Sequence, residues 1–337
     1  MTMQRAARLQ AAGQIEIHDI AVPAAGADGI VVQVAACGIC GTDLSFYRAP
    51  TVPPGSVLGH EFSGRIVAIG KDVDGLALGD RVVVNPMTQG VGLGRADGAF
   101  SHYVRVDAPE RDKTVFVLPE TVSDEAGALV EPFSVGLHAV NSAGLRATDR
   151  VVIFGAGMIG QCVLAALRAK GVRDILVIDY SERRLQLAMQ LGARAVHDPR
   201  NGSARAFVGH HFREEMTRFA DEPLAEADVA FDCAGVAAVL TDGLRSLRRR
   251  GKFVIVADHH GPATIDMRLL MLRRITMIGV LAYDEEFAEA IDLMARSVVD
   301  LMPLVTHRFA LEDLAEAFRA QLDTDNAVKV MMTHAIG

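Results

Sequence analysis

One short turn constrains this chain more than any other feature: a G-x-G-x-x-G spacing that follows an apolar run and opens a helical pattern. The apolar run covers residues 151–154, and the turn consists of Gly155, Ala156, Gly157, Met158, Ile159 and Gly160. The first glycine permits a tight turn, the second lets a diphosphate approach the backbone, and the third lets the helix lie close to the strand. Because the amino end of the helix would face the phosphates, the turn predicts a dinucleotide-binding α/β domain.

Asp179 indicates which dinucleotide is bound. It ends the next apolar run, about 20 residues beyond the turn, where a carboxylate accepts hydrogen bonds from both hydroxyls of an adenosine ribose. A 2′-phosphate would be repelled there, although Arg183 and Arg184 are close enough in sequence to weaken the repulsion. The sequence therefore favours NAD over NADP, with Arg184 as a further cofactor contact. A glycine turn in an unrelated α/β protein, the alternative, would not account for the strand, the helix and the acid together.

The rest of the second half supports an α/β domain. Apolar runs alternate there with helical periodicity, which is typical of a parallel sheet covered by helices. We expect strands over residues 151–154, 175–179, 195–197, 229–232, 253–257 and 275–279, and helices over 158–170, 182–191, 204–219, 237–247 and 267–272. His259 and His260 follow one of these strands, near the expected nicotinamide, but nothing in the sequence fixes their orientation, which favours a solvated loop.

The first half has a different residue pattern, in which short β-rich segments are separated by turns. We expect strands over 15–20, 29–36, 61–69, 81–85 and 101–106, which together predict a small β barrel. Four glycines between residues 90 and 98 predict a flexible surface loop. Beyond residue 286 come two more helical patterns and two strand candidates, 308–310 and 328–332, that could return to the first domain.

The composition of the chain argues against nucleic acid and membranes as binding partners. A net charge of −8 with 34 Lys and Arg spread along the chain argues against binding nucleic acid, and the basic stretch 245–252 is better explained as the solvated end of a helix stopped by Gly251. The apolar runs are far shorter than the roughly 20 residues that cross a bilayer, so we expect no membrane association. The first residues lack the features of a secretory signal, which predicts a cytoplasmic protein.

Three residues have side chains that suit zinc. Cys40, His60 and Glu131 offer a thiolate, an imidazole and a carboxylate, a set that leaves a fourth position open for water or substrate. A redox pair of Cys37 with Cys40 is the alternative, but the helix and βαβ setting expected for it are missing. The sequence therefore favours a catalytic metal site.

Taken together, the motifs resemble those of the zinc-containing medium-chain dehydrogenases, most of all the sorbitol and polyol dehydrogenase branch. The matching segments are residues 37–43, 59–61, 79–82, 131–138, 155–160 and 303–309, and the resemblance covers nearly the whole chain. It implies a GroES-like β-barrel catalytic domain formed by residues 1–146 and 284–337, and a Rossmann NAD-binding domain formed by residues 147–283. It also implies a homodimer or homotetramer.

The resemblance assigns roles to residues of the first domain. It implies that Cys40 and His60 hold the catalytic zinc, that Glu131 matches the third ligand, and that Glu61 binds the metal or stands just outside it. Thr42 matches the hydroxyl that takes the proton of the substrate alcohol. Zinc favours the alkoxide form of an alcohol, and hydride then passes to the nicotinamide.

Two departures from the family pattern bear on metal content and substrate. No cysteine occurs between Asn85 and Ser101, where many relatives carry a lobe that binds a structural zinc, so we expect one catalytic zinc per subunit and no structural zinc. Ala282 replaces an arginine of sorbitol dehydrogenases, and Ser45 replaces a histidine, so the proton exit could run through Ser45 or the cofactor ribose. Both changes weaken sorbitol as the specific substrate.

The expected function is interconversion of a secondary alcohol, such as a polyol, sugar alcohol or sugar acid, and its ketone by zinc-dependent hydride transfer to NAD. A threonine-type or vicinal-diol dehydrogenase would use the same groups. A non-catalytic dinucleotide-binding sensor is the third alternative, because a fold does not imply a function. Intact Cys40, His60, Glu131 and Thr42 argue against the sensor.

Overall fold

A computed structural model describes residues 2–216, 223–259 and 261–334, and the chain forms two compact units. Unit 1 comprises Met1–Glu131, Phe287–Asp323 and Ala327–Gly337, and unit 2 comprises Pro132–Glu286 and Thr324–Asn326. The expected boundary after residue 146 would leave helix α3 (Val130–Ala143) with the first domain. By its contacts, α3 belongs to unit 2 from Pro132 onward, because a Cβ on Gly136 would lie only 2.6 Å from the backbone of Cys162. Among the described residues, no helix combines the length and apolar character needed to cross a membrane.

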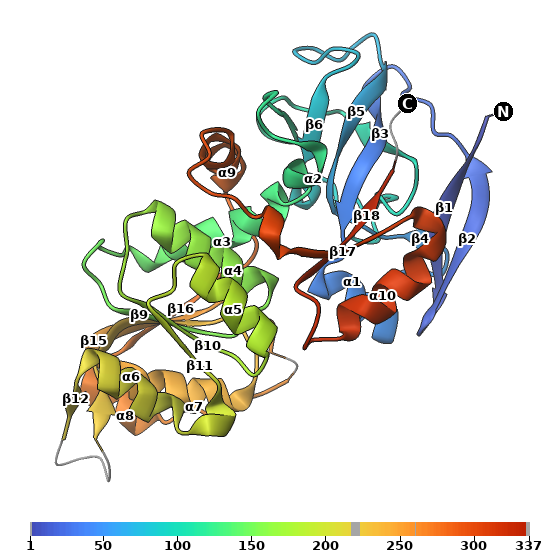
Figure 1. Ribbon diagram of the computed structural model, residues 1–337. Coiled ribbons are helices and arrows are strands. Elements are labelled where there is room, and N and C mark those ends of the chain that lie inside the picture. The colour runs from blue at the N-terminus through green and yellow to red at the C-terminus, as the bar shows by residue number, and fades with distance from the viewer. Residues whose placement is uncertain (1, 217–222, 260, 335–337) are drawn as a thin grey trace. The chain divides into compact units, whose positions relative to one another are not determined.

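Unit 1 is built on two sheets (Figure 1). The larger has strand order β17-β18-β3-β5-β6-β8, with β7 also paired to β3, and the smaller has order β2-β1-β4. The strands are β1 (Met3–Ala11), β2 (Gln14–Ala21), β3 (Gly29–Gly38), β4 (Ser56–Val57), β5 (Glu61–Ile69), β6 (Arg81–Val84), β7 (Tyr103–Asp107), β8 (Val115–Val117), β17 (Val305–Phe309) and β18 (Lys329–Thr333). Helical segments of this unit are α1 (Gly41–Arg48), η1 (Pro86–Thr88), α2 (Asp124–Gly127), η3 (Met302–Leu304), η4 (Leu311–Asp313) and α10 (Leu314–Leu322), and α9 (Glu286–Ala295) follows the boundary.

The end of the chain completes the sheet of unit 1. Strand β18 runs antiparallel to β3, with Met332 opposite Cys37, so the expected return of the chain to the first unit is confirmed. Val330 and Met332 are fully buried in the same core as Val32 and Phe100. This pairing brings residues near position 330 beside those near position 40, which matters for the metal site.

Unit 2 contains a six-stranded parallel sheet with order β11-β10-β9-β14-β15-β16, flanked by helices. Figure 1 shows α4 and α5 on one face and α6, α7 and α8 on the other. The strand order reverses between β9 and β14, and ligands of such sheets bind beyond the carboxyl ends at that point. The elements are β9 (Val151–Phe154), α4 (Met158–Ala169), β10 (Ile175–Ile178), α5 (Glu182–Gln190), β11 (Ala195–His197), η2 (Pro199–Asn201), α6 (Ala204–Phe212), β12 (Glu214–Glu215), β13 (Leu224–Ala225), β14 (Ala227–Asp232), α7 (Ala237–Ser246), β15 (Leu247–Ile255), α8 (Met267–Arg273) and β16 (Thr276–Gly279).

The expected strands of this unit are present because both faces of the sheet are covered. Every residue of β9 and β10 is buried, which explains their continuous apolar runs. The expected helix 204–219 is shorter, since α6 ends at Phe212 and Arg213 adopts a positive φ of 77° before the short strand β12. Residues 217–219 lie outside the described part of the chain.

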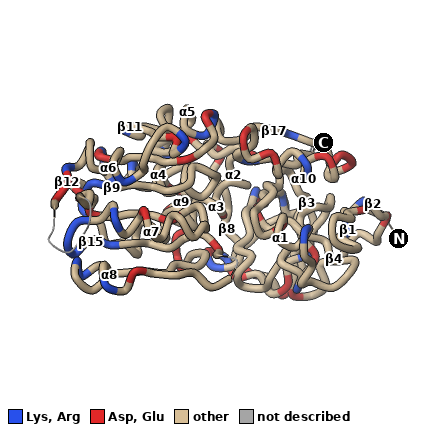
Figure 2. Tube along the Cα trace, turned by 90° about the horizontal axis from the view of Figure 1, so that it is seen from below, with Lys and Arg blue, Asp and Glu red and all other residues tan. Residues whose placement is uncertain are grey.

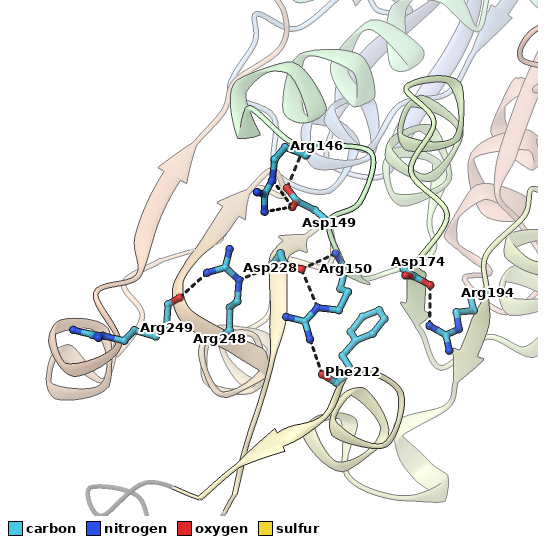
Figure 3. Close-up of polar contacts among 9 residues, drawn as sticks. All are labelled: Arg146, Asp149, Arg150, Asp174, Arg194, Phe212, Asp228, Arg248 and Arg249. Atoms are coloured by element: carbon cyan, nitrogen blue, oxygen red, sulfur yellow. Dashed lines mark hydrogen bonds and ion pairs between the residues drawn. The ribbon is translucent and has the colours of Figure 1, made fainter.

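The basic stretch was wrongly expected to end a helix. Helix α7 ends at Ser246, and Leu247 starts β15, so residues 248–250 lie in a strand. Figure 2 shows basic residues along β15 and α8. Arg248 pairs with Asp228, whose other oxygen accepts a 2.9 Å hydrogen bond from Arg150 (Figure 3). The strand pairing and this buried carboxylate outweigh the preference of cations for a helix end.

The glycine-rich loop 90–98 also differs from the expected flexible surface loop, because its central part is packed. Val91 is fully buried, and the Gly92 amide donates to the carbonyl of Ala96 at 3.0 Å. A Cβ on Gly92 would lie 2.1 Å from the carbonyl oxygen of Gly59. The backbone of the loop therefore lies directly against the segment that carries His60.

Candidate active site

Cys40 lies at the amino end of helix α1 and is held there by a local hydrogen bond. The Cys40 amide donates to Oδ2 of Asp43 at 2.9 Å, as in a capping box. The residues 40–43 therefore fix the start of the helix and the direction of the Cys40 side chain.

His60 is buried and faces the same aspartate. Its Nδ1 lies 3.5 Å from Oδ1 of Asp43, which also accepts from the Gly59 amide at 3.4 Å. Burial lowers the pKa of His60, but the charges of Asp43 and Cys40 outweigh that effect and raise this pKa well above its usual value. Asp43, itself fully buried, therefore orients both Cys40 and His60. Asp43 was assigned no role from the sequence, although its spacing from Cys40 is that of a capping pair.

The side chains of Cys40, His60 and Glu61 converge. One ligand atom from each, the thiol sulfur, a ring nitrogen and a carboxylate oxygen, lie within 4.8 Å of one another. Zinc bonds of about 2.0–2.3 Å to such atoms place tetrahedral ligands about 3.3–3.8 Å apart. The group therefore fits zinc in both donor chemistry and spacing, with only a small contraction.

Lys329 enters this site from β18 and was not singled out by sequence reasoning. Its Nζ lies 2.5 Å from Oε2 of Glu61 and donates to the carbonyl of Ile39 at 3.0 Å. Both partners of the ion pair are almost fully buried. Burial lowers the pKa of Lys329, but Glu61, Cys40 and Glu131 raise it above its usual value. In the sequence, the only indication of this role is a lysine within a largely apolar strand. Its partner, Glu61, lies 268 positions away in the chain.

The remaining expected site residues of unit 1 lie close by. Glu131 is buried at the start of α3 and acts electrostatically on Lys329, but it is outside the group of three converging side chains. Thr42 is exposed in the first turn of α1. Ser45 donates its hydroxyl proton to the carbonyl of Gly41 at 3.1 Å, within the same helix.

The glycine turn of unit 2 has the features expected for a diphosphate site. Gly155 has φ of 95°, and a Cβ there would lie 2.8–2.9 Å from the backbone of Cys233 and Ala234. A Cβ on Gly160 would lie 1.9 Å from the Gly155 carbonyl oxygen. At Gly157, the N-cap of α4, the nearest atom to a Cβ would be Nη1 of Arg184 at 3.7 Å. Met158 and Ile159 form the first turn of α4.

Asp179 is connected to this turn. Its Oδ2 accepts from the Ala156 amide at 2.6 Å, and its Oδ1 accepts from the Ser181 amide at 2.8 Å. Ser181 is the N-cap of α5, which carries Arg184. The carboxylate therefore links the ends of β9 and β10 and has remaining lone pairs for a ligand hydroxyl.

Comparison with known proteins identifies the family. The zinc-binding dehydrogenase family matches residues 159–296, and the alcohol dehydrogenase GroES-like domain matches residues 26–119. The chain therefore belongs to the zinc-binding alcohol dehydrogenases, an oxidoreductase family with a GroES-like and a Rossmann-type domain. It uses zinc and a nicotinamide cofactor. The expected family, fold class and dehydrogenase activity are confirmed.

Individual relatives cover nearly the whole chain. (R,R)-butanediol dehydrogenase of Bacillus subtilis is 33% identical, with 97% of this chain and 99% of that protein covered. Sorbitol dehydrogenase of the same organism is 31% identical, with 97% and 96% covered. The crystal structure of 2R,3R-butanediol dehydrogenase from Bacillus subtilis has a TM-score of 0.89 and 32% identity, and covers 98% of this chain and 100% of that chain.

Proposed function

We propose that this protein oxidises one secondary hydroxyl of a vicinal diol or polyol to a ketone, with NAD as hydride acceptor. The convergence of Cys40, His60 and Glu61 is the main observation behind this proposal. It brings together a thiolate, an imidazole and a carboxylate, which are the ligand types that zinc binds. The names of similar proteins, butanediol and sorbitol dehydrogenases, support a substrate with neighbouring hydroxyls. They support a vicinal diol as the substrate as much as they support a polyol.

In this proposal one zinc ion per subunit is held by Cys40, His60 and a carboxylate from Glu61 or Glu131. Bound zinc supplies a Lewis acid for the alcohol oxygen. Asp43 keeps the His60 ring in place, and Lys329 neutralises Glu61 when that carboxylate is not needed as a ligand. The absence of cysteine between Asn85 and Ser101 supports a single zinc.

Thr42 accepts the alcohol proton in the same scheme. It stands two residues after Cys40 on an exposed helix turn, as the family resemblance implies. Ser45 is less suited to pass that proton on, because its hydroxyl already donates to the Gly41 carbonyl. The proton exit therefore runs through the cofactor ribose rather than through Ser45.

NAD is preferred to NADP because of Asp179. Its carboxylate stands beside the glycine turn, where it accepts ribose hydroxyls and repels a 2′-phosphate. Nη1 of Arg184 would lie 3.7 Å from a Cβ on Gly157, so its guanidinium is placed to contact the diphosphate. The free cysteines of the chain are consistent with the cytoplasm as its compartment.

A homodimer or homotetramer is also part of the proposal. Strand β16 lies at the edge of its sheet, so its outer backbone groups are available for pairing. Large apolar side chains are exposed in the segments that precede and follow it in the chain, with Leu281 84%, Met267 65% and Met271 63% accessible. An interface over these residues would remove an unfavourable apolar surface from water.

The test is turnover with a panel of substrates. Purified protein is incubated with NAD and with vicinal diols, polyols, threonine and hydroxy acids, each with and without a strong chelator. We expect NADH formation from a diol or polyol that the chelator abolishes. NADH formation that the chelator leaves unchanged would refute the zinc mechanism, and no NADH from any substrate would favour the sensor.

A further inference from the structure

A buried aspartate and a histidine form a pair at the carboxyl end of the unit 2 sheet. Asp232 is the last residue of β14, and its side chain is fully buried. Its Oδ2 lies 2.7 Å from Nε2 of His259, which follows β15 and is 18% exposed. The sequence favoured a solvated loop for these residues. For His259 that expectation was wrong, because Asp232 fixes the ring. His260 lies outside the described residues.

The surroundings of Asp232 hold two loops together. Its Oδ1 accepts from the amides of Ala234 and Gly235, each at 3.0 Å. Its main-chain carbonyl accepts from the amides of residues 256 and 257, also at 3.0 Å. A Cβ on Gly235 would lie 2.7 Å from the carbonyl oxygen of Asp258, so the two loops are in direct contact. The position of His259 is therefore set by packing as well as by its ion pair.

The pair also sets the tautomer of His259. An ionised carboxylate only accepts hydrogen bonds, so the neutral ring must carry its proton on Nε2. Nδ1 is then an acceptor, and within the described part of the chain no contact with it is found. A partly exposed ring with one acceptor ready suits a ligand hydroxyl or amide. It does not suit a phosphate, which offers no proton.

The place of the pair in the sheet identifies which part of the cofactor it meets. Asp179 follows β10, on one side of β9, whereas Asp232 ends β14 and His259 follows β15, on the other side. A dinucleotide lies across the carboxyl ends of these strands, with its diphosphate over the glycine turn. Since Gly155 touches the backbone of Cys233 and Ala234, the loop after Asp232 adjoins that turn. The half of the cofactor beyond the diphosphate would therefore reach His259.

We propose that Nδ1 of His259 accepts a hydrogen bond from a hydroxyl of the nicotinamide ribose, with Asp232 as the residue that positions the ring. The inference rests on the proposed NAD-linked function. It adds a cofactor-binding residue on the nicotinamide side.

Calorimetric titration with three ligands tests the assignment. ADP carries the adenosine and the diphosphate, ADP-ribose adds the second ribose, and NADH adds the nicotinamide. His259→Ala should weaken binding of NADH and ADP-ribose about 3- to 10-fold, the loss of one hydrogen bond, and leave ADP unchanged. His210→Ala, at an exposed position of α6, should leave all three affinities unchanged.

A second variant separates hydrogen bonding from folding. In Asp232→Asn the amide oxygen still accepts from residues 234 and 235, but the amide nitrogen donates to Nε2 and moves the imidazole proton to Nδ1. Asp232→Asn should therefore weaken ADP-ribose as His259→Ala does, while ADP binding stays intact. Unchanged ADP-ribose affinity in both variants, or a loss confined to NADH, or an equal loss for ADP, would each overturn the inference. If the unmodified protein bound neither NADH nor ADP, the proposed function itself would fail.

Discussion

Lys329 and Glu61 form an ion pair of 2.5 Å in the interior of unit 1, next to the two side chains that converge with Glu61 on the candidate metal position. Removing both charges from water is costly, and the pair offsets that cost only while both partners remain. A carboxylate in this position has two alternative cations, the lysine and a metal ion. The pair therefore connects the stability of the barrel to the occupancy of its metal site.

Removal of Lys329 should destabilise the protein. Lys329→Met leaves Glu61 buried and unpaired, and we expect a loss of about 3–5 kcal/mol in the free energy of unfolding, measured with urea on metal-free protein. The double variant Lys329→Met with Glu61→Gln should recover most of that loss. If the double variant were as unstable as the single one, the ion pair would not be the cause.

Gly38 should be intolerant of even one methyl group. Its Cβ would lie 2.2 Å from Oε2 of Glu61 and 3.1 Å from Cδ of Lys329. We expect Gly38→Ala to displace Glu61 and to cost about 1–3 kcal/mol of stability. Gly41→Ala is the matched control, since nothing lies within 4 Å of its Cβ. Equal melting temperatures for the two variants would contradict this prediction.

The positioning role of Asp43 can be measured as metal affinity. Asp43→Asn keeps an acceptor for the Cys40 amide but removes the charge facing His60. Zinc affinity should fall about 10- to 100-fold, as is typical when the partner of a metal-binding histidine changes. Competition with a chromogenic chelator measures this affinity.

Cys40→Ser should lose zinc and turnover while NADH binding persists. Retained zinc in that variant would refute Cys40 as a ligand.

Cofactor preference should depend on Asp179. Asp179→Ser removes the charge that opposes a 2′-phosphate but retains a hydroxyl near the Ala156 and Ser181 amides. The ratio of kcat/KM for NAD to that for NADP should fall at least about tenfold, the equivalent of about 1.4 kcal/mol. An unchanged ratio would mean that a group other than Asp179 distinguishes the 2′-hydroxyl of NAD from the 2′-phosphate of NADP.

Stability should decrease in mild acid because of His334. Burial, with a contribution from His102, lowers the pKa of His334 to about 4. Unfolded chains bind a proton to histidine near pH 6.5, so the unfolded state gains protons first, and stability is lost as pH falls from about 6.5 to about 4, by up to about 3 kcal/mol. His334→Gln should flatten this part of the pH profile measured by urea unfolding. A profile that keeps its full slope would assign the effect to other groups.

The sequence predicted the α/β unit better than the barrel, for a physical reason. Strands buried on both faces appear as unbroken apolar runs, as in β9 and β10. Strand β1 was not predicted, because its inward positions include Gln4 and Ala6 rather than large apolar residues, so alternation is weak. The strand around Arg248 was taken for a helix end because its carboxylate partner, Asp228, is brought to it only by the fold.

The candidate site shows the same limit. Cys40, His60 and Glu61 could be found because each lies in a recognisable short motif. Lys329 and the Asp232–His259 pair could not, since their meaning depends on partners 268 and 27 positions away. Short-range patterns predict which side chains can react, whereas the neighbours that set their charge and tautomer come from tertiary packing.

The packed glycine loop limits how this protein can be engineered. Long surface loops usually accept inserted residues at little cost. Here a Cβ on Gly98 would lie 2.4 Å from Gly92 and 2.6 Å from the Gly59 carbonyl oxygen, so the loop has no room for side chains where it meets the segment before His60. An affinity tag or a domain inserted between residues 90 and 98 would therefore disturb the metal site. The sequence alone would suggest this insertion point, because its four glycines predict a flexible surface loop.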